Sequence, residues 1–296
     1  MSSFHTGLYR QFEHSVRLAG RLRVSARRLN DLKKVAIVMT SLDSRLVRRF
    51  ALCVFALALS TGRVGAQTTQ APAPGLEEGF SAEIARFVET DRVAPPADCQ
   101  VLFVGSSSIF KWRENLAVDM APMPVINRGF GGSHIKDLNR WFDQLVAPYR
   151  PRAIVFYAGE NDIDAGKSAD RIVADFDEFM TRKTQALGKT PVYFISLKPS
   201  KLRFAQFALQ SQVNDAIRAR AGKRSDLRYI DVVSPMLENG KPKDLFGPDD
   251  LHMAAAGYVI WTRAVRAALL PNTDAEERNC RLTAARPSAV KPTSRQ

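Results

Sequence analysis

The chain has 296 residues, 45% of them hydrophobic, and carries a formal net charge of +13 at pH 7. This length and composition suffice for one large folded domain or two small ones. The positive charge is concentrated at the start, because residues 1–66 hold 12 of the 43 basic and only 3 of the 30 acidic side chains. The rest of the chain has a net charge of only +4, with both signs mixed, so we expect no nucleic-acid partner.

Residues 39–66 have the pattern of a secretory signal peptide. Three arginines precede an apolar run over residues 50–60, and the small residues up to Ala66 match a cleavage site. The run is too short to cross the roughly 30 Å apolar core of a bilayer as a helix. We therefore expect cleavage after Ala66, export to a bacterial-type periplasm or beyond, and no stable membrane anchor in the mature protein.

Two interpretations of residues 1–38 remain open. A signal peptide normally stands at the N-terminus, which favours Met39 as the true start and makes residues 1–38 a non-native or disordered extension. Alternatively, these arginine-rich residues form a basic arm or an organelle presequence. The Pro-rich polar residues 67–75 are expected to be a linker.

Short apolar segments alternate with helical patterns through the rest of the chain. A helix is predicted over residues 76–93. Strands are then predicted at residues 101–104, 124–126, 153–157, 192–196 and 227–231, and helices at 135–145, 169–186, 204–221 and 254–269. This alternation predicts a three-layer α/β/α sandwich with a five-stranded parallel sheet. We place the domain at residues 76–271 and expect residues 272–296 to form a polar C-terminal tail.

Four polar loops are predicted at the carboxyl ends of the strands, where sites form in such sheets. They span residues 105–108, 127–135, 158–164 and 246–258. The glycine-rich second loop fits neither the dinucleotide fingerprint nor the P-loop, so no nucleotide cofactor is expected. The chain also lacks the Cys and His spacing of a zinc site, so no metal is expected.

Taken together, these loops contain the parts of a serine hydrolase. A serine nucleophile needs a histidine base, and the base needs a carboxylate that orients it. His252 follows Asp249 by three residues, a spacing that lets the carboxylate reach the imidazole. His134 has no carboxylate at that spacing and is expected to be a surface or capping residue. A glycine N–H of the second loop and the Asn161 amide are candidate donors to an oxyanion.

The order of these blocks resembles the SGNH hydrolase superfamily, or GDSL-type esterases, over residues 101–268. The resemblance implies that Ser107, in "VLFVGSSSI", is the nucleophile and that Asp249 and His252 complete the triad. It also implies an oxyanion hole made by Ser107, Gly132 of "NRGFGG" and Asn161 of "GEND". The usual Gly-Asp-Ser is Gly-Ser-Ser here, and the replaced Asp is not a triad member.

The resemblance implies a flavodoxin-like SGNH fold and an esterase without a cofactor. Residues 127–132 and the Asp-x-Leu-His block are similar to the platelet-activating-factor acetylhydrolase branch, which suggests short acyl esters of small molecules or carbohydrates. One alternative is an O-acetyl deacetylase or acetyltransferase acting on cell-envelope carbohydrate. Another is a flavodoxin-like binding protein in which the blocks are incidental.

Two further features are left open by the sequence. Cys99 precedes the first strand and Cys280 follows the last helix, so both are predicted at the amino ends of the strands, either bridged or as free thiols. The second feature is a set of residues that either line the pocket or pack in the core: Trp112, Phe130, Lys198, Pro199, Ser200 and Phe204.

Overall fold

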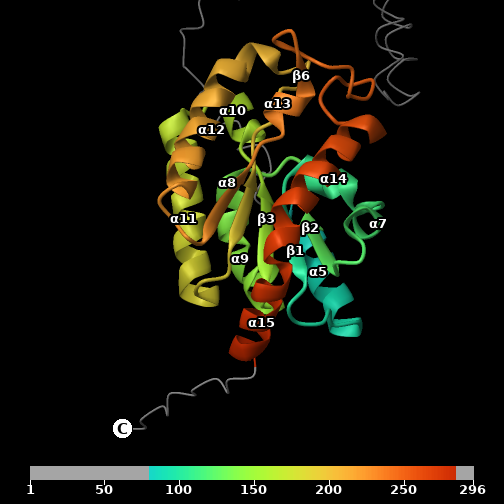
Figure 1. Cartoon of the computed structure of the whole chain (residues 1–296), viewed down its shortest axis with the longest axis vertical. Helices are drawn as coiled ribbons and strands as arrows, with labels where there is room; N and C mark the ends of the chain where they lie inside the picture. The colour runs from blue at the N-terminus through green and yellow to red at the C-terminus, as the bar shows by residue number, and fades with distance from the viewer. Residues whose placement is uncertain (1–79, 285–296) are drawn as a thin grey trace, which may run out of the picture. The chain divides into compact units, whose positions relative to one another are not determined.

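The computed structural model describes residues 80–284, which form a five-stranded parallel sheet with helices on both faces (Figure 1). The strand order is β2-β1-β3-β4-β5. The strands are β1 (Val101–Gly105), β2 (Val125–Gly129), β3 (Ala153–Tyr157), β4 (Val192–Ile195) and β5 (Leu227–Ile230). The expected three-layer α/β/α fold is therefore confirmed, whereas the predictions for residues 1–38, 39–66 and 67–75 lie outside the described residues.

The central strands are apolar throughout because both of their faces are covered. Every residue of β1 and β3 is buried. On β3, Phe156 packs its ring against Phe176 of one helix, while the next residue, Tyr157, packs against Trp261 of another. Successive strand residues point to opposite faces, so these two contacts place one helix on each side of the sheet.

The helices of the two outer layers vary widely in length. They are α5 (Ser81–Val93), α6 (Ser107–Trp112), α7 (Leu116–Met120), α8 (Ile135–Arg140), α9 (Phe142–Leu145), α10 (Glu160–Asp164), α11 (Ala169–Leu187), α12 (Phe207–Ala221), α13 (Val233–Met236), α14 (Ala255–Leu269) and α15 (Thr273–Ala284). Three 3-10 turns, η1 (Ala147–Tyr149), η2 (Phe204–Gln206) and η3 (Leu270–Asn272), and a hairpin of β6 (Leu237–Glu238) and β7 (Lys241–Pro242) complete the described chain. Between residues 80 and 284, no helix has both the length and the apolar character needed to cross a membrane.

Helix α11 shows how local sequence sets these boundaries. Its N-cap residue, Ser168, accepts a hydrogen bond from the backbone N–H of Arg171. The helix ends at Leu187 and is followed by Gly188, whose φ of +59° is readily adopted only by glycine. Between these ends, buried residues recur at helical spacing: Ile172, Val173, Phe176, Phe179 and Met180.

Strand β2 is longer than the predicted segment 124–126 and runs to Gly129. Asn127 remains in the strand because its side chain is fully engaged. Its Nδ2 donates to the Ile109 carbonyl at 2.8 Å, and its Oδ1 accepts from the Gly129 N–H at 2.9 Å. A polar side chain thus lies within the strand with both of its amide atoms hydrogen-bonded.

The ordered fold also continues past residue 271, where the sequence predicted a polar tail. Helix α15 packs beside the amino ends of the strands (Figure 1). Glu276 of α15 is buried and accepts a hydrogen bond from the Tyr193 hydroxyl of β4 at 2.5 Å. Burial raises the pKa of this carboxyl above its usual value, although the bond from Tyr193 opposes the shift. The polar sequence of α15 gave no indication of this helix, because the helix is held by contacts with a strand that is distant in sequence.

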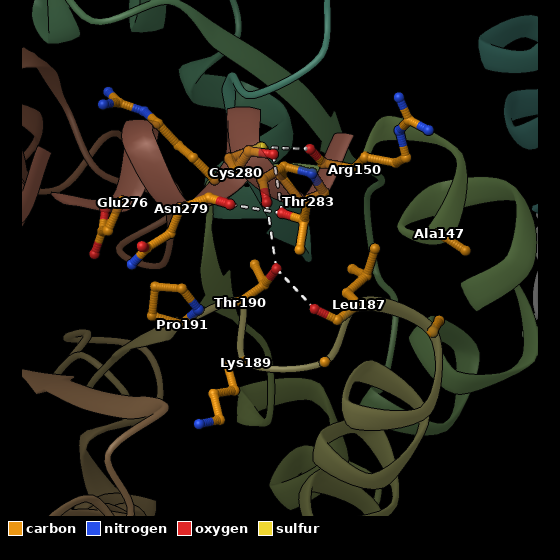
Figure 2. A pocket seen from close by; sticks show the side chains of 14 residues that line it. Ala147, Arg150, Leu187, Lys189, Thr190, Pro191, Glu276, Asn279, Cys280 and Thr283 are labelled. Atoms are coloured by element: carbon orange, nitrogen blue, oxygen red, sulfur yellow. Dashed lines mark hydrogen bonds between the residues drawn. The ribbon is translucent and has the colours of Figure 1, made fainter. Parts of the chain in front are cut away.

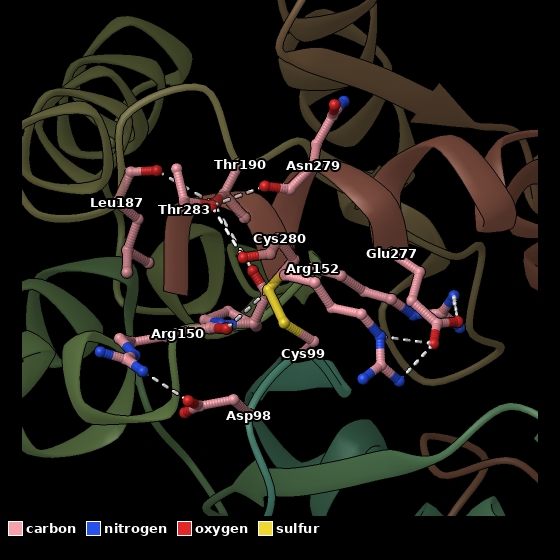
Figure 3. The surroundings of a disulfide bond; sticks show 12 residues. Asp98, Cys99, Arg150, Arg152, Leu187, Thr190, Glu277, Asn279, Cys280 and Thr283 are labelled. Carbon is pink, nitrogen blue, oxygen red and sulfur yellow. Dashed lines mark hydrogen bonds and ion pairs between the residues drawn. A yellow bond between two sulfur atoms is a disulfide. The ribbon is translucent and has the colours of Figure 1, made fainter. Parts of the chain in front are cut away.

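Cys99 and Cys280 form a disulfide that joins α15 to the segment before β1, as one of the two sequence interpretations predicted (Figure 3). Their Cα atoms are 5.7 Å apart. Beside the bridge, the Cys99 N–H donates to the Arg150 carbonyl at 3.3 Å, and the Arg150 guanidinium pairs with Asp98. The cysteines are separated by 181 positions, so the bridge closes a loop that contains all five strands of the sheet.

Loss of this bridge is expected to destabilise the domain. A Cys280→Ser substitution should lower the free energy of unfolding by about 2–5 kcal/mol, because the cross-link restricts the unfolded chain over a very long loop. Urea unfolding of protein that begins at Gln67, followed by circular dichroism, measures this change.

The control is the same protein unfolded with a reductant. Reduction should lower the stability of the wild type by a similar amount and leave Cys280→Ser unchanged. Thiol titration of the denatured, unreduced wild type should find no free thiol. Two free thiols per chain would contradict the bridge.

Candidate active site

Four polar loops gather at the carboxyl ends of the strands, the end of the molecule opposite α15 (Figure 1). Strands β1, β2 and β3 end in register at Gly105, Gly129 and Tyr157. The candidate serine, glycine and asparagine follow these strand ends by two, three and four residues, respectively. The sheet therefore brings three loops that are distant in sequence to one edge, as predicted for parallel strands.

Ser107 is the first residue of α6, immediately after the end of β1. Gly105 allows this sharp turn, because a Cβ at that position would lie 2.0 Å from the Tyr157 carbonyl oxygen. The N–H of Ser106 donates to the same oxygen at 2.9 Å, and the Ser106 carbonyl accepts from the first turn of α6. Ser106 is thus the N-cap residue, Ser108 is buried, and Ser107 between them is partly exposed.

The second and third loops are joined by side-chain hydrogen bonds. The Asn161 Nδ2 donates to the Ser133 carbonyl at 3.0 Å. The buried carboxylate of Asp162 accepts from the Ile135 N–H at 3.2 Å, at the start of α8. Gly132 has φ +80° and open space around it, which leaves its backbone accessible. These bonds hold the candidate oxyanion donors of the two loops in a defined relation.

Asp249 and His252 form the pair that their spacing predicted. The Oδ2 of Asp249 lies 2.6 Å from the His252 Nδ1, and its Oδ1 accepts from the backbone N–H of His252 at 2.9 Å. These hydrogen bonds hold the pKa of the Asp249 carboxyl well below its usual value. With Nδ1 donating to a carboxylate, the ring presents Nε2 as an acceptor. That atom is buried and has no hydrogen-bond partner within residues 80–284.

Helix α14 ties this last loop to the first one. It begins shortly after His252, and its Tyr258 hydroxyl donates to the Ser108 carbonyl in α6 at 2.9 Å. Behind this bond, the ring of Trp112 packs 5.5 Å from that of Tyr258, between centroids. Helix α6, which carries the candidate nucleophile, is therefore in direct contact with α14, which follows the candidate base.

His134 lies at the N-cap position of α8 and is buried rather than at the surface. Its backbone N–H donates to Asp137 at 2.8 Å, and its Nε2 is 3.2 Å from the Asn161 carbonyl. The imidazole Nδ1 lies 3.5 Å from Asp137 Oδ2, and the interaction of the ring with this carboxylate raises the pKa of His134, although burial opposes the shift. The capping role was predicted; the contact with Asn161 was not.

Most of the residues left open as pocket or core belong to the core. Trp112 and Phe130 are almost fully buried among apolar side chains. Lys198 and Ser200 are also buried, whereas Phe204 is partly exposed and stacks on Phe207 at 5.2 Å. Phe204 is thus the one member of this set that is not buried.

A buried charged cluster lies beneath the third loop, and sequence analysis missed it. The Nζ of Lys198 is 2.6 Å from the Glu160 Oε2, which also accepts from the Tyr157 hydroxyl at 2.5 Å. The Lys198 and Glu160 side chains are only 1% and 4% exposed. Burial, together with the neighbouring carboxylate, raises the pKa of Tyr157 well above its ordinary value. The position of Glu160 directly before Asn161 was the available signal, but nothing in the sequence identified its partner.

A cavity of about 840 Å³ lies at the other end of the molecule, between α15 and the chain segments that enter β3 and β4 (Figure 2). Arg150, Thr190, Pro191 and Glu276 are among its lining residues, and Cys280 of the disulfide closes one side. None of the predicted site residues lines it. The cavity is thus a feature of the α15 attachment and separate from the candidate active site.

The fold and the loop blocks define the class of α/β/α serine hydrolases. The model of the GDSL-like lipase/acylhydrolase family matches residues 103–260, and the chain belongs to this family. Lipases and acylhydrolases act on ester bonds, and this chain is accordingly an enzyme of the ester-hydrolysing serine hydrolase class. No protein among the curated sequences compared matches the chain.

Several solved structures share the fold at low sequence identity. A candidate acylhydrolase from Bacteroides fragilis is 21% identical, with a TM-score of 0.57 over 65% of this chain and 98% of its own. A GDSL-like lipase from Bacteroides thetaiotaomicron is 19% identical, with a TM-score of 0.53 over 63% and 97%. A candidate platelet activating factor from Streptococcus pneumoniae is 18% identical, with a TM-score of 0.56 over 65% and 95%.

The buried ion pair beneath the third loop gives a stability prediction. A Lys198→Met substitution should lower the free energy of unfolding by about 3–5 kcal/mol, because it leaves the Glu160 carboxylate buried without its counter-charge. Urea unfolding monitored by circular dichroism measures the change.

Lys201→Met is the matched control. Lys201 also pairs with a carboxylate at 2.6 Å, but its partner Asp244 is 91% exposed, so this substitution should leave the free energy of unfolding nearly unchanged. Equal losses for the two variants would contradict a special contribution from burial.

Proposed function

We propose that the protein is an exported serine esterase that hydrolyses short-chain acyl esters through Ser107, His252 and Asp249. The observation that carries this proposal is the Asp249–His252 pair, bonded at 2.6 Å with the imidazole Nε2 buried and unpaired within the described chain. A base held in this tautomer is ready to accept the proton of an alcohol. The contact between α14 and α6 supports Ser107 as that alcohol.

The proposed mechanism proceeds through an acyl-enzyme. The Nε2 of His252 takes the proton of the Ser107 hydroxyl as its oxygen attacks the ester carbonyl carbon. The backbone N–H groups of Ser107 and Gly132 and the Asn161 amide donate to the oxyanion. The alkoxide leaves with the proton from His252. Water then attacks the acyl-serine by the same route and releases the acid.

The acyl and compartment parts of the proposal rest on separate observations. The resemblance of residues 127–132 to the acetylhydrolase branch supports short acyl groups. The signal-peptide pattern of residues 39–66 supports export, and so does the Cys99–Cys280 disulfide, because disulfides persist mainly in oxidising compartments.

Removal of the proposed nucleophile tests the mechanism. Ser107→Ala should lower kcat for ester hydrolysis by on the order of a millionfold, as loss of a triad serine does in well-measured enzymes. The substitution should leave the far-ultraviolet circular dichroism spectrum unchanged. Rates are measured on nitrophenyl esters that differ only in acyl length.

Ser106→Ala and Ser108→Ala are the neighbouring controls, and both should retain activity within about tenfold of wild type. Loss of activity in one of them, with Ser107→Ala active, would show that another serine attacks. Acetyl and butyryl esters should react faster than esters longer than about eight carbons. Faster release of acetate from acetylated carbohydrate would favour the deacetylase alternative.

Export is tested at the N-terminus of the protein recovered from the cell envelope or medium. Sequencing should find Gln67 as the first residue, because cleavage is expected after Ala66. A mature chain that retains residues 1–38 would contradict both the start at Met39 and the cleavage.

A further inference from the structure

The Asn161 side chain is held at both ends of its amide. Its Oδ1 accepts a hydrogen bond from Nη1 of Arg203 at 3.0 Å, and its Nδ2 donates to the Ser133 carbonyl at 3.0 Å. We propose that Arg203 is a positioning residue of the oxyanion hole, which acts by orienting the Asn161 amide. This proposal rests on the proposed function, because it takes Asn161 as an oxyanion donor.

The chemistry of the amide explains why an arginine is needed there. A terminal amide can rotate by half a turn, which exchanges its oxygen and nitrogen at little steric cost. Arg203 has only N–H donors, so the oxygen of Asn161 must face it and the nitrogen must face the opposite side. One N–H of Nδ2 is used by the Ser133 carbonyl. The second N–H then points in a fixed direction and is available to an oxyanion.

Arg203 is itself held in place from a second direction. Its Nη2 donates to Asp164 Oδ2 at 2.9 Å, and Asp164 Oδ1 accepts from Gln206 at 2.9 Å. The Arg203 side chain is only 12% exposed, whereas that of Asp164 is 48% exposed. Asn161 is the second residue of α10 and Asp164 is the last, so the planar guanidinium of Arg203 is bonded to two points of this short helix. These two bonds fix the orientation of the guanidinium.

The segment that carries Arg203 is also attached to the loop of the proposed base. The backbone N–H of Leu202 donates to the Asp250 carbonyl at 2.9 Å, and Asp250 lies between Asp249 and His252. One short stretch of chain therefore contacts both the oxyanion asparagine and the Asp–His loop. Its position suits a group that aligns the site without contacting the reacting atoms.

A double-mutant cycle separates this role from its alternatives. Arg203→Met should lower kcat for acetyl ester hydrolysis by about 10–100-fold and change KM by less than about threefold, because only transition-state stabilisation is lost. In an Asn161→Ala background, the same substitution should change kcat by less than about threefold, since the group that Arg203 orients is absent. The full chain is used, and initial rates are measured over a range of substrate concentrations so that kcat and KM are obtained separately.

Two further variants keep the test decisive. Arg203→Lys preserves the charge with fewer, unforked donors and should lie between wild type and Arg203→Met, again only while Asn161 is present; it replaces Arg203→Met if that variant fails to fold. Arg218→Met is the matched control, because Arg218 lies on α12 beside Asp215 and Tyr229, and it should keep full activity.

Three outcomes would overturn the proposal. An equal loss in the presence and absence of Asn161 would mean that Arg203 acts by its charge or directly on substrate. A rise in KM with unchanged kcat would make it a binding residue, and unchanged kinetics would make it structural. If wild-type hydrolysis does not depend on Ser107, the proposed function itself fails, and this result is distinguishable because it does not involve Arg203.

Discussion

The close contact between the end of β1 and the carbonyl of Tyr157 determines the geometry of the whole candidate site. Only a residue without a side chain fits at Gly105, since a Cβ there would lie 2.0 Å from that oxygen, and the next N–H donates to the same oxygen. Helix α6 therefore starts directly at the strand end and presents Ser107. The chain that leaves Tyr157 leads within four residues to Asn161. One backbone contact thus relates the proposed nucleophile to a proposed oxyanion donor.

The features that follow from local sequence were predictable. Strands β1 and β3 are apolar at nearly every position because both faces are covered, and a continuous apolar run bounded by turn residues indicates such a strand. The Asp249–His252 contact was predictable because three residues of a turn bring the two side chains together. The boundaries of β2 were less certain, because Asn127 is polar and its partner, Ile109, lies in another element.

The features that depend on distant partners were not predictable from one sequence. Helix α15 has the composition of a polar tail, and its attachment depends on a strand some 80 positions earlier, through the hydrogen bond from Tyr193 to Glu276. Lys198 was noted only as a residue of the pocket or the core, and Arg203 was no more conspicuous than the many other basic residues of the chain. Their roles depend on Glu160 and Asn161, about 40 positions away, and spacing along a chain carries no such information.

The disulfide that joins α15 to the segment before β1 also determines which parts of the chain stay covalently linked. Cys99 lies just before β1 and Cys280 in α15, and their Cα atoms are only 5.7 Å apart although 181 positions separate them. The segment from Cys99 to Cys280, which contains the whole sheet, is therefore covalently closed, whereas α5 lies outside this closed segment. The hairpin of β6 and β7 turns at the exposed residues Asn239 and Gly240, both with positive φ, away from the sheet. Proteolytic cleavage at that turn would leave the fragment that holds the five strands joined through the disulfide to the fragment that holds Asp249 and His252.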